Sequence, residues 1–338
     1  MKTPGLLKCA GAVVALAIVS ACGSGSAVAP SAATLHTAYV GKTLFVNGRP
    51  TTAAHLNPLP RYAGLVPDRK SKKYEYIIND YGSYASMFNY PASTQMVGQI
   101  NGAGGQGCTN VLYGYGKKII WNAGRTNDVI TEYKVPSNQV IKTLSLPYTF
   151  TSSCAMNTSG DIAIGILLSN SYGPAGQVVI FKNATGTPTV YNTPLAREYF
   201  DGYDPSGNLF ADGFDLDYNF ALVELPKGST KAVTIKTSNS PEFPGSVQWD
   251  GTYLSVFDQL TSETYQYTVS GTTATLKNTV QFNGAADCAQ TWIVKGLLYC
   301  GDAGNDGAEV YNYPAGGSPL ATFSGNFDFP LGVTAAKK

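Results

Sequence analysis

Histidine and charge are both scarce in this chain of 338 residues. The only two histidines are His36 and His55, so the rest of the sequence contains no imidazole. This excludes a His-ligated zinc or copper ion and a His general base from residue 56 onward. Charged residues make up 13% of the chain and the formal net charge is +1. The one basic cluster, "RKSKK" at residues 69–73, is interpreted as a solvated edge, and no nucleic-acid partner is expected.

Long apolar runs are lacking except at the N-terminus. There, Lys2 and Lys8 precede an apolar run from Ala10 to Ala21 that is too short for a permanent membrane span. This pattern predicts an export signal over residues 1–21. No second apolar stretch of about 18 residues follows, so no other segment is expected to cross a membrane.

The apolar run ends in "VSAC", residues 19–22, which resembles the lipobox of bacterial lipoproteins. The resemblance implies cleavage before Cys22, lipidation of Cys22, and a location at the outer membrane or cell surface with the lipid as the only anchor. An ordinary secretory signal that happens to contain Cys22 remains the alternative. Residues 22–73 are rich in Ala, Ser, Gly, Thr and Pro and are predicted to be mostly a flexible tether, in which "KTLFVNG" could dock.

From Tyr74 onward the chain has no amphipathic helical pattern and many short β-branched or alternating runs, which predicts an all-β domain over residues 74–338. The runs pair across turns that carry a regularly spaced glycine. The separations between these glycines are 44, 47, 44 and 45 residues, and the positions are Gly116, Gly160, Gly207, Gly251 and Gly296. Glycine is favoured at such turns because it adopts positive φ at little cost.

A period of about 44 residues with four short antiparallel strands is typical of a β-propeller blade. The spacing predicts six blades. The first blade lacks an innermost strand, because "YEYIIND" at 74–80 matches the second strand of the other units. We expect residues 331–336 to supply that strand and close the ring, which would remove an open sheet edge.

This pattern resembles NHL-like and related six-bladed propellers, including uncharacterised bacterial surface lipoproteins, over about the last four-fifths of the chain. The resemblance implies a fold and a habit of binding ligands, not one reaction. Some members of that group are His-dependent lyases, and the lack of histidine here argues against that activity.

Carboxylates are the remaining candidates for chemistry. Strand ends and strand starts that should meet at one mouth of the ring carry Asp residues, with Asn122 and Asp212 also at strand ends. Together they could hold a calcium ion, as lactonase-type propellers do, through Asp80, Asp201, Asp258, Asp287 and Asp302. The favoured alternative is that these side chains bond the backbone of their own turns. No other cofactor is predicted.

Aromatic and cysteine residues allow two interpretations each. Trp121, Trp249 and Trp292 could bind a sugar or a protein, but their strand positions favour filling the space between blades.

Four cysteines remain after the predicted processing, and an even number in an exported protein favours disulfides. Three pairings are open; one would join Cys108 to Cys154 across neighbouring innermost strands and Cys288 to Cys300 within one hairpin. A catalytic thiol is disfavoured, because no histidine can pair with it.

The sequence thus favours a monomeric, exported, lipid-anchored propeller that binds an unknown protein or carbohydrate at one face and is not an enzyme. A calcium-dependent, lactonase-like hydrolase is the alternative. A purely structural role would instead show as a large apolar patch on one loop face.

Overall fold

A computed structural model describes residues 38–40, 43–46, 49–52, 74–80, 84–117, 119–123, 129–147, 151–167, 176–323, 325, 327 and 329–337. Contacts divide the chain into two units, residues 1–55 and 56–338. In the first unit, β1 (Ala38–Val40), β2 (Thr43–Val46) and β3 (Arg49–Thr52) form an antiparallel sheet within the predicted tether. The predicted signal, Cys22 and the rest of the tether lie outside the described residues.

Apart from the short strand β8, the described strands of the second unit form six antiparallel groups of four, here called blades 1 to 6. Blade 1 contains β28 (Pro330–Lys337), β4 (Tyr74–Asp80), β5 (Tyr84–Phe88) and β6 (Met96–Asn101). Blade 2 contains β7 (Gln106–Cys108), β9 (Ile119–Ala123), β10 (Val129–Lys134) and β11 (Gln139–Ser145). Blade 3 contains β12 (Ala155–Met156), β13 (Ile162–Ile166), β14 (Gln177–Phe181) and β15 (Thr189–Asn192).

The remaining blades follow the same order from the centre outward. Blade 4 contains β16 (Arg197–Tyr203), β17 (Leu209–Phe214), β18 (Phe220–Leu225) and β19 (Val233–Thr237). Blade 5 contains β20 (Val247–Trp249), β21 (Leu254–Asp258), β22 (Glu263–Ser270) and β23 (Thr273–Gln281). Blade 6 contains β24 (Cys288–Val294), β25 (Leu297–Asp302), β26 (Gly307–Asn312) and β27 (Ala321–Thr322).

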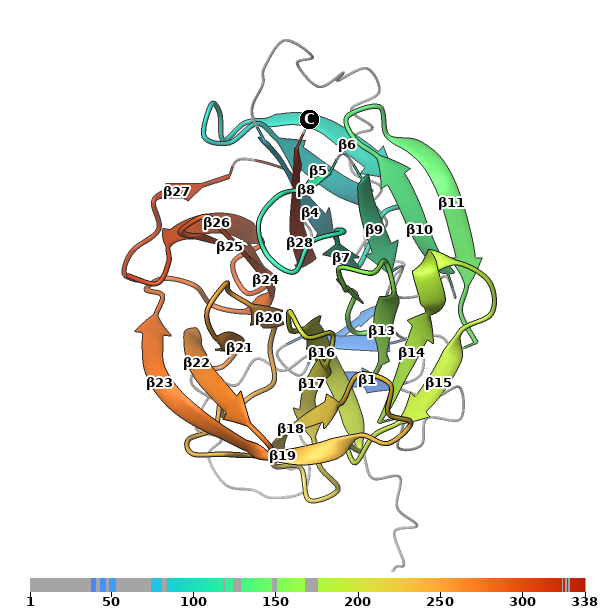
Figure 1. Ribbon diagram of the computed structural model, residues 1–338. Coiled ribbons are helices and arrows are strands. Elements are labelled where there is room, and N and C mark those ends of the chain that lie inside the picture. The colour runs from blue at the N-terminus through green and yellow to red at the C-terminus, as the bar shows by residue number, and fades with distance from the viewer. Residues whose placement is uncertain are drawn as a thin grey trace, which may run out of the picture. The chain divides into compact units, whose positions relative to one another are not determined.

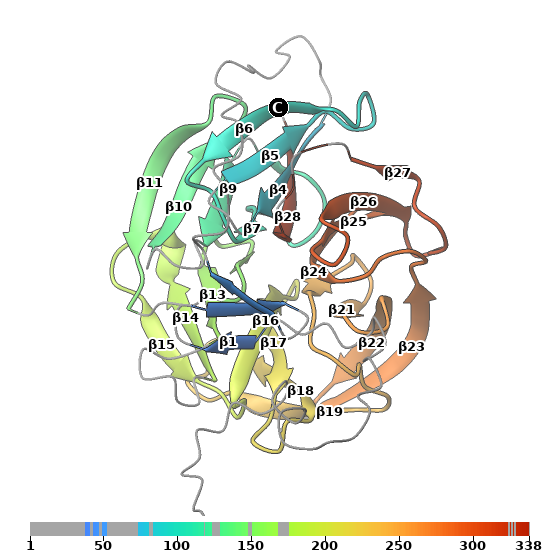
Figure 2. The same ribbon diagram turned by 180° about the vertical axis from the view of Figure 1, so that it is seen from behind.

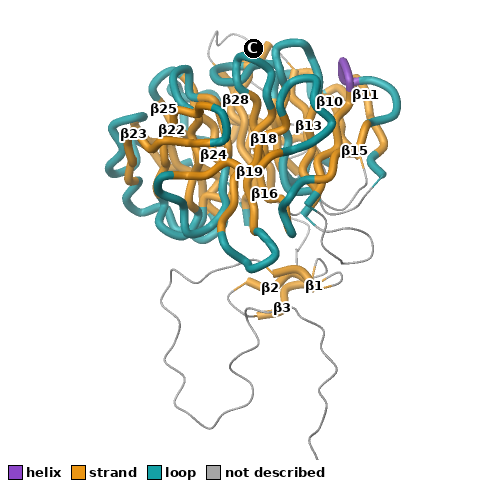
Figure 3. Tube along the Cα trace, turned by 60° about the horizontal axis from the view of Figure 1, so that its bottom comes forward, coloured by secondary structure: helices purple, strands orange, loops and turns teal. Residues whose placement is uncertain are grey.

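The blades stand in a ring, with the first strands at the centre and the fourth strands at the periphery (Figure 1). Two short parallel pairings add to this plan: β19 with β23 between blades 4 and 5, and β8 (Gly116–Lys117) with β28. The tube view shows strands forming the body of the ring and loops gathered at its two faces (Figure 3). The helical turn η3 (Lys182–Ala184) is short, and no described residue belongs to a helix that could cross a membrane.

Burial explains why these segments form strands. The second strands β13 and β21 are buried at every position, because each is flanked by other strands and covered on both faces by neighbouring blades. The outer strands β11 and β23 are mostly exposed, and only Leu144 of β11 and Ala274 and Val280 of β23 are buried. The apolar clusters lie between adjacent blades; one joins Trp121 of blade 2 to Ile164 and Phe181 of blade 3. The core therefore exists only once the blades pack on one another.

The predicted glycine turns are confirmed at four of five positions. Gly160, Gly207, Gly251 and Gly296 have φ of 94°, 88°, 107° and 79°. The prediction is wrong for Gly116, which lies in β8, while Gly114 takes the positive φ of 97°. A side chain at residue 116 would collide with Thr109, so glycine is needed there for close approach instead.

The C-terminal strand closes the ring as predicted. β28 pairs with β4 in antiparallel register, with Val333 opposite Ile78 and Ala335 opposite Tyr76. Figures 1 and 2 show β28 beside β4 on the inner side of blade 1. Every residue of β28 except Lys337 is buried, so the strand also supplies core to blades 1 and 6.

Substitution Val333→Asp tests this closure. Val333 is 1% exposed, and burying an unpaired carboxylate there should lower the free energy of unfolding by about 3–5 kcal/mol. The measurement is urea unfolding followed by tryptophan fluorescence. Lys337→Asp, at the exposed end of the same strand, is the control and should change stability by less than about 1 kcal/mol. Equal stability of Val333→Asp and wild type would contradict the placement of β28.

Candidate functional site

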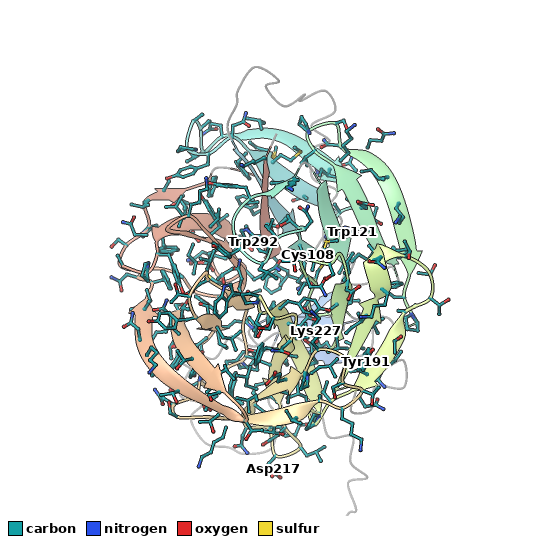
Figure 4. The ribbon with its side chains drawn as sticks, in the orientation of Figure 1. Cys108, Trp121, Tyr191, Asp217, Lys227 and Trp292 are labelled. Atoms are coloured by element: carbon teal, nitrogen blue, oxygen red, sulfur yellow. A yellow bond between two sulfur atoms is a disulfide. The ribbon has the colours of Figure 1, made fainter. Side chains whose placement is uncertain are left out.

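The centre of the ring contains an axial cavity of about 30 Å³. A water molecule needs roughly 10–15 Å³ by this measure, so the cavity holds about two waters. It is lined by first strands of blades 2 to 6 and by residues next to them, including Cys108, Ser153, Asp201, Gln248, Gln290 and Trp292. Figure 4 places Cys108 and Trp292 close to the centre. An organic substrate does not fit in this space.

Two glutamine side chains join first strands that make no backbone ladder with one another. The Gln248 amide donates to the Ile293 carbonyl oxygen (3.2 Å) and accepts from the Ile293 N–H (2.7 Å). Gln290 does the same with Gly107, at 2.9 Å and 3.1 Å, and also accepts from the Val333 N–H at 3.0 Å. Each side-chain amide thus pairs with a backbone peptide as a strand would, which satisfies buried polar groups at the axis.

The loop between β7 and β8 covers one end of the axial cavity. The indole Nε1 of Trp292 donates to the Gly114 carbonyl oxygen (2.8 Å), and Gln248 donates to that of Leu112 (3.1 Å). The Gly114 N–H donates to the Ile293 carbonyl oxygen at 3.2 Å. Figure 1 shows this loop curving across the centre of the ring. The buried Trp121 and Trp292 therefore serve packing and loop anchoring, and Trp249 is half-buried at the cavity wall.

Asp258 and Asp302 bond backbone amides. Asp302 accepts from the N–H groups of Ala286, Asp287, Gly304 and Asn305 at 2.9–3.2 Å. Asp258 likewise accepts from Glu242, Phe243, Leu260 and Thr261 at 2.6–3.3 Å. Each carboxylate ties its own turn to the segment that leads into the first strand of the same blade. Asp258 and Asp302 therefore bond the backbone of their own turns, which is the alternative that the sequence favoured over calcium binding.

The other strand-end side chains also bond their surroundings. Asp212 accepts from the Phe200 and Gly245 N–H groups at 3.1 Å and 3.0 Å. The Asn122 amide donates to the Gln106 carbonyl oxygen at 3.0 Å. Asp287 is buried immediately before β24 and also has an interaction partner. The side chain of Asp80 lies outside the described part of the chain.

Among the described residues, one set of three ligand-type side chains brings its ligand atoms within 4.8 Å of one another: Cys288, Cys300 and Asp302. The two sulfurs of this set form a disulfide, and the carboxylate bonds amides. This set of three therefore does not fit a calcium ion, which takes roughly six to eight oxygens.

Asp201 differs from the other aspartates. It is 5% exposed and lines the axial cavity, where its carboxyl oxygens make no close hydrogen bond within the described residues and the Ser153 hydroxyl is the nearby donor. Burial raises its pKa to about 7. Sequence reasoning placed this residue at the mouth of the ring but gave no sign that it would lack a close hydrogen bond.

Glu198, three residues earlier on β16, was not predicted as a site residue. It is fully buried and accepts from the Ser152 hydroxyl (2.5 Å) and the Ser153 hydroxyl (3.4 Å). Burial and then the neighbouring Asp201 raise the pKa of Glu198 well above its usual range. Gly165 makes room for it, because a side chain there would occupy the position of the Glu198 carboxyl. The pair concentrates two acids between blades 3 and 4.

A second hollow, the interblade cleft, opens where turns of blades 3 and 4 meet and has a volume of about 310 Å³. Its walls come from the turns after β12, β16 and β18 and from Ile180, Lys182 and Tyr191. Tyr203 lines both this cleft and the axial cavity. Sequence reasoning missed the cleft, because its residues lie in separate segments between 157 and 230 with no shared motif.

Of the three pairings that the sequence left open, the structure contains Cys108–Cys154 and Cys288–Cys300. Cys108 and Cys154 join the first strand of blade 2 to the residue before β12 of blade 3, with Cα atoms 5.4 Å apart. Cys288 and Cys300 join the β24–β25 hairpin, with Cα atoms 5.3 Å apart. Cys300 lies opposite Thr291 in the ladder, so the two cysteines are not directly opposite, as expected.

No protein-family model matches the chain, and no curated protein matches it. Solved structures do match. The structure of a nidogen/laminin complex has a TM-score of 0.59 at 11% identity, covering 78% of this chain and 98% of that one. A protein of unknown function from Bacteroides caccae has 0.58 at 12%, covering 79% and 100%. A candidate 6-phosphogluconolactonase from Bacteroides uniformis has 0.54 at 10%, with the same coverage.

The chain is a β-propeller. At these identities the similarity carries the fold and no activity. The finer resemblance to NHL-like lipoproteins stays a prediction.

Asp201→Asn tests the buried acid at the axial cavity. A pKa raised from its ordinary value near 3.9 to about 7 means that folding takes up a proton between these pH values, so this residue's contribution to stability is lost as pH rises through that window. At pH 8 the variant should be more stable than wild type by about 4 kcal/mol, and at pH 4 the two should be nearly equal. Urea unfolding at both pH values measures this. A constant difference across pH would contradict the assignment.

Asp302→Asn should behave in the opposite way. Asparagine has one acceptor oxygen and turns its NH₂ group toward backbone donors, so the variant should lose about 2–4 kcal/mol at pH 8. The same unfolding experiment gives the comparison with Asp201→Asn. Unchanged stability of Asp302→Asn would mean that its amide contacts do not support the turn.

Proposed function

We propose that the protein is an exported, lipid-anchored β-propeller that acts as a binding or scaffolding module at the bacterial cell envelope. The observation that carries the binding role is the interblade cleft between blades 3 and 4, since the axial cavity of about 30 Å³ holds only about two waters. Recognition then takes place on the faces, where the interblade cleft of about 310 Å³ falls in the usual range of roughly 300–1,000 Å³ for ligand sites.

The side-chain inventory also supports binding rather than catalysis. Residues 56–338 contain no histidine, and Asp212, Asp258 and Asp302 accept hydrogen bonds from backbone amides. Large exposed apolar side chains in the described part come from several separate segments, including Tyr113, Ile141 and Leu216, which does not favour a purely structural role. The nidogen/laminin neighbour is a complex between proteins, so the fold is compatible with partner binding.

The calcium-dependent hydrolase is the competing proposal and rests on fold similarity to the candidate 6-phosphogluconolactonase. The described carboxylates offer no calcium cluster to support it. Purified full-length protein should therefore release no acid from 6-phosphogluconolactone or from simple γ-lactones above the uncatalysed rate, with or without 1 mM-scale calcium or chelator. Calcium-dependent turnover abolished by Asp201→Asn would overturn the binding role.

The envelope anchor is tested at Cys22. Expressed in a Gram-negative host, the wild-type chain should fractionate with membranes, and Cys22→Ser should move it to the soluble fraction because the lipid has no attachment point. Cys9→Ser, within the predicted signal, is the matched control and should leave the membrane fraction unchanged. Mass spectrometry of the mature N-terminus reports the lipid directly. Membrane association of Cys22→Ser equal to wild type would contradict the anchor.

A further inference from the structure

The interblade cleft combines polar turns with a short apolar wall. The turn residues that line it include the hydroxyls Thr158, Ser159, Ser206, Ser229 and Thr230, and its apolar lining is Ile180, Leu209, Leu225, Pro205 and Pro226. A site of many hydroxyls beside a small apolar surface suits a ligand that is itself half polar and half apolar. Sugar rings have this character, because their hydroxyl edges hydrogen-bond while their C–H faces pack on apolar or aromatic side chains.

Charge in the cleft is positive. Its charged lining residues are Lys182, Lys227 and Asp161. Asp161 and Lys182 are paired at 3.0 Å, and the same carboxylate accepts from the Asn183 N–H and the Asn157 amide at 2.9 Å and 3.1 Å. These bonds use the carboxylate fully, and they outweigh the opposing effect of burial and hold its pKa below the usual range. The remaining positive charge belongs to Lys227.

Lys227 is held in place without a partner for its charge. Its backbone N–H donates to the Asn208 side chain at 3.0 Å. Its stem lies over the Gly207 turn, with Cδ 3.3 Å and Nζ 3.7 Å from the position that a Cβ of residue 207 would take. Within the described residues its ammonium makes no ion pair or hydrogen bond. An exposed, positioned ammonium in a cleft is available to an anionic ligand group.

Two tyrosines complete the cleft. Tyr191 is half-buried at its edge, and Tyr203 is 5% exposed at its base. Figure 4 shows Tyr191 and Lys227 in the same part of the ring. Burial, with Asp201 as the next cause, raises the pKa of Tyr203 well above its usual range, so its hydroxyl keeps its proton and can donate. Tyr191 places an aromatic side chain in the lining of the cleft.

We propose that the interblade cleft binds an acidic sugar, a pyranose unit that carries one carboxylate, with the carboxylate at Lys227 and a ring face on Tyr191. This inference rests on the proposed binding role and names the ligand class for one site. The cleft's volume of about 310 Å³ accommodates one or two such units.

The test uses full-length protein and saturation-transfer difference NMR with three probes: D-glucuronate, D-glucose and acetate. Glucuronate should bind at least about tenfold more tightly than glucose, which lacks the charge, and than acetate, which lacks the ring. Lys227→Gln should weaken glucuronate binding about tenfold while leaving glucose unchanged. Tyr191→Ala should reduce saturation of the ring protons with both sugars.

Lys231→Gln is the matched control. Lys231 is an exposed lysine four residues along the same turn and does not line the cleft, so its substitution should leave all three affinities unchanged. Equal glucuronate affinity in Lys227→Gln and wild type, or an equal loss in both lysine variants, would overturn the inference.

Different results would contradict the acidic-sugar assignment and the broader binding role. Absence of saturation transfer from wild-type protein to glucuronate overturns the acidic-sugar assignment. If envelope extracts then yield a specific partner whose capture survives Lys227→Gln, the binding role stands with its site elsewhere. Lactone turnover by the wild-type protein would overturn the binding role itself.

Discussion

The pairing of β28 with β4 is the constraint on which the ring depends. Each blade can bury its apolar faces only against two neighbours, so a ring with one missing contact would expose the core of two blades at once. The chain solves this by using its last strand as the first strand of blade 1, with Val333 opposite Ile78. Because β28 also packs on blade 6, one strand joins the beginning and the end of the domain.

Closing the ring sets the size of its centre, and side chains then fill it. Gln248 and Gln290 pair with backbone peptides of neighbouring first strands, and Trp292 fixes the β7–β8 loop over one end. These contacts satisfy polar groups that would otherwise be buried without partners. The same contacts reduce the axial cavity to about 30 Å³. Filling the axis therefore leaves the interblade cleft, formed by turns, as a larger hollow than the axial cavity.

The repeat allowed much of the fold to be predicted from the sequence. Glycine recurs in the turn between the first and second strands because that turn contains a residue with positive φ. Gly160, Gly207 and Gly251 therefore mark blades 3, 4 and 5. The prediction was wrong by two residues at Gly116. Glycine is needed there because a side chain would collide with Thr109, whereas the residue with positive φ is Gly114. The closing strand was predictable because the first repeat lacks its innermost strand, and a segment from elsewhere in the chain must supply it.

The sites were harder to predict, since their properties come from contacts between blades. Asp302 follows a local rule, because it bonds the turn that begins at its own residue. The surroundings of Glu198 come instead from Ser152 and Gly165, which lie more than 30 residues earlier in the chain. Lys182 lies in blade 3 and Lys227 in blade 4, so the two residues line the same cleft only when these blades pack together.

Asp201 and Asp302 show how one residue type takes opposite roles in the same ring. Both are acids on inner strands with nearly complete burial. Asp302 receives several backbone amides from its own turn and from the segment before β24. Asp201 faces the small axial cavity instead, and burial raises its pKa to about 7. Because Tyr203 borders both the axial cavity and the interblade cleft, a ligand in the cleft would lie two residues along β16 from this acid.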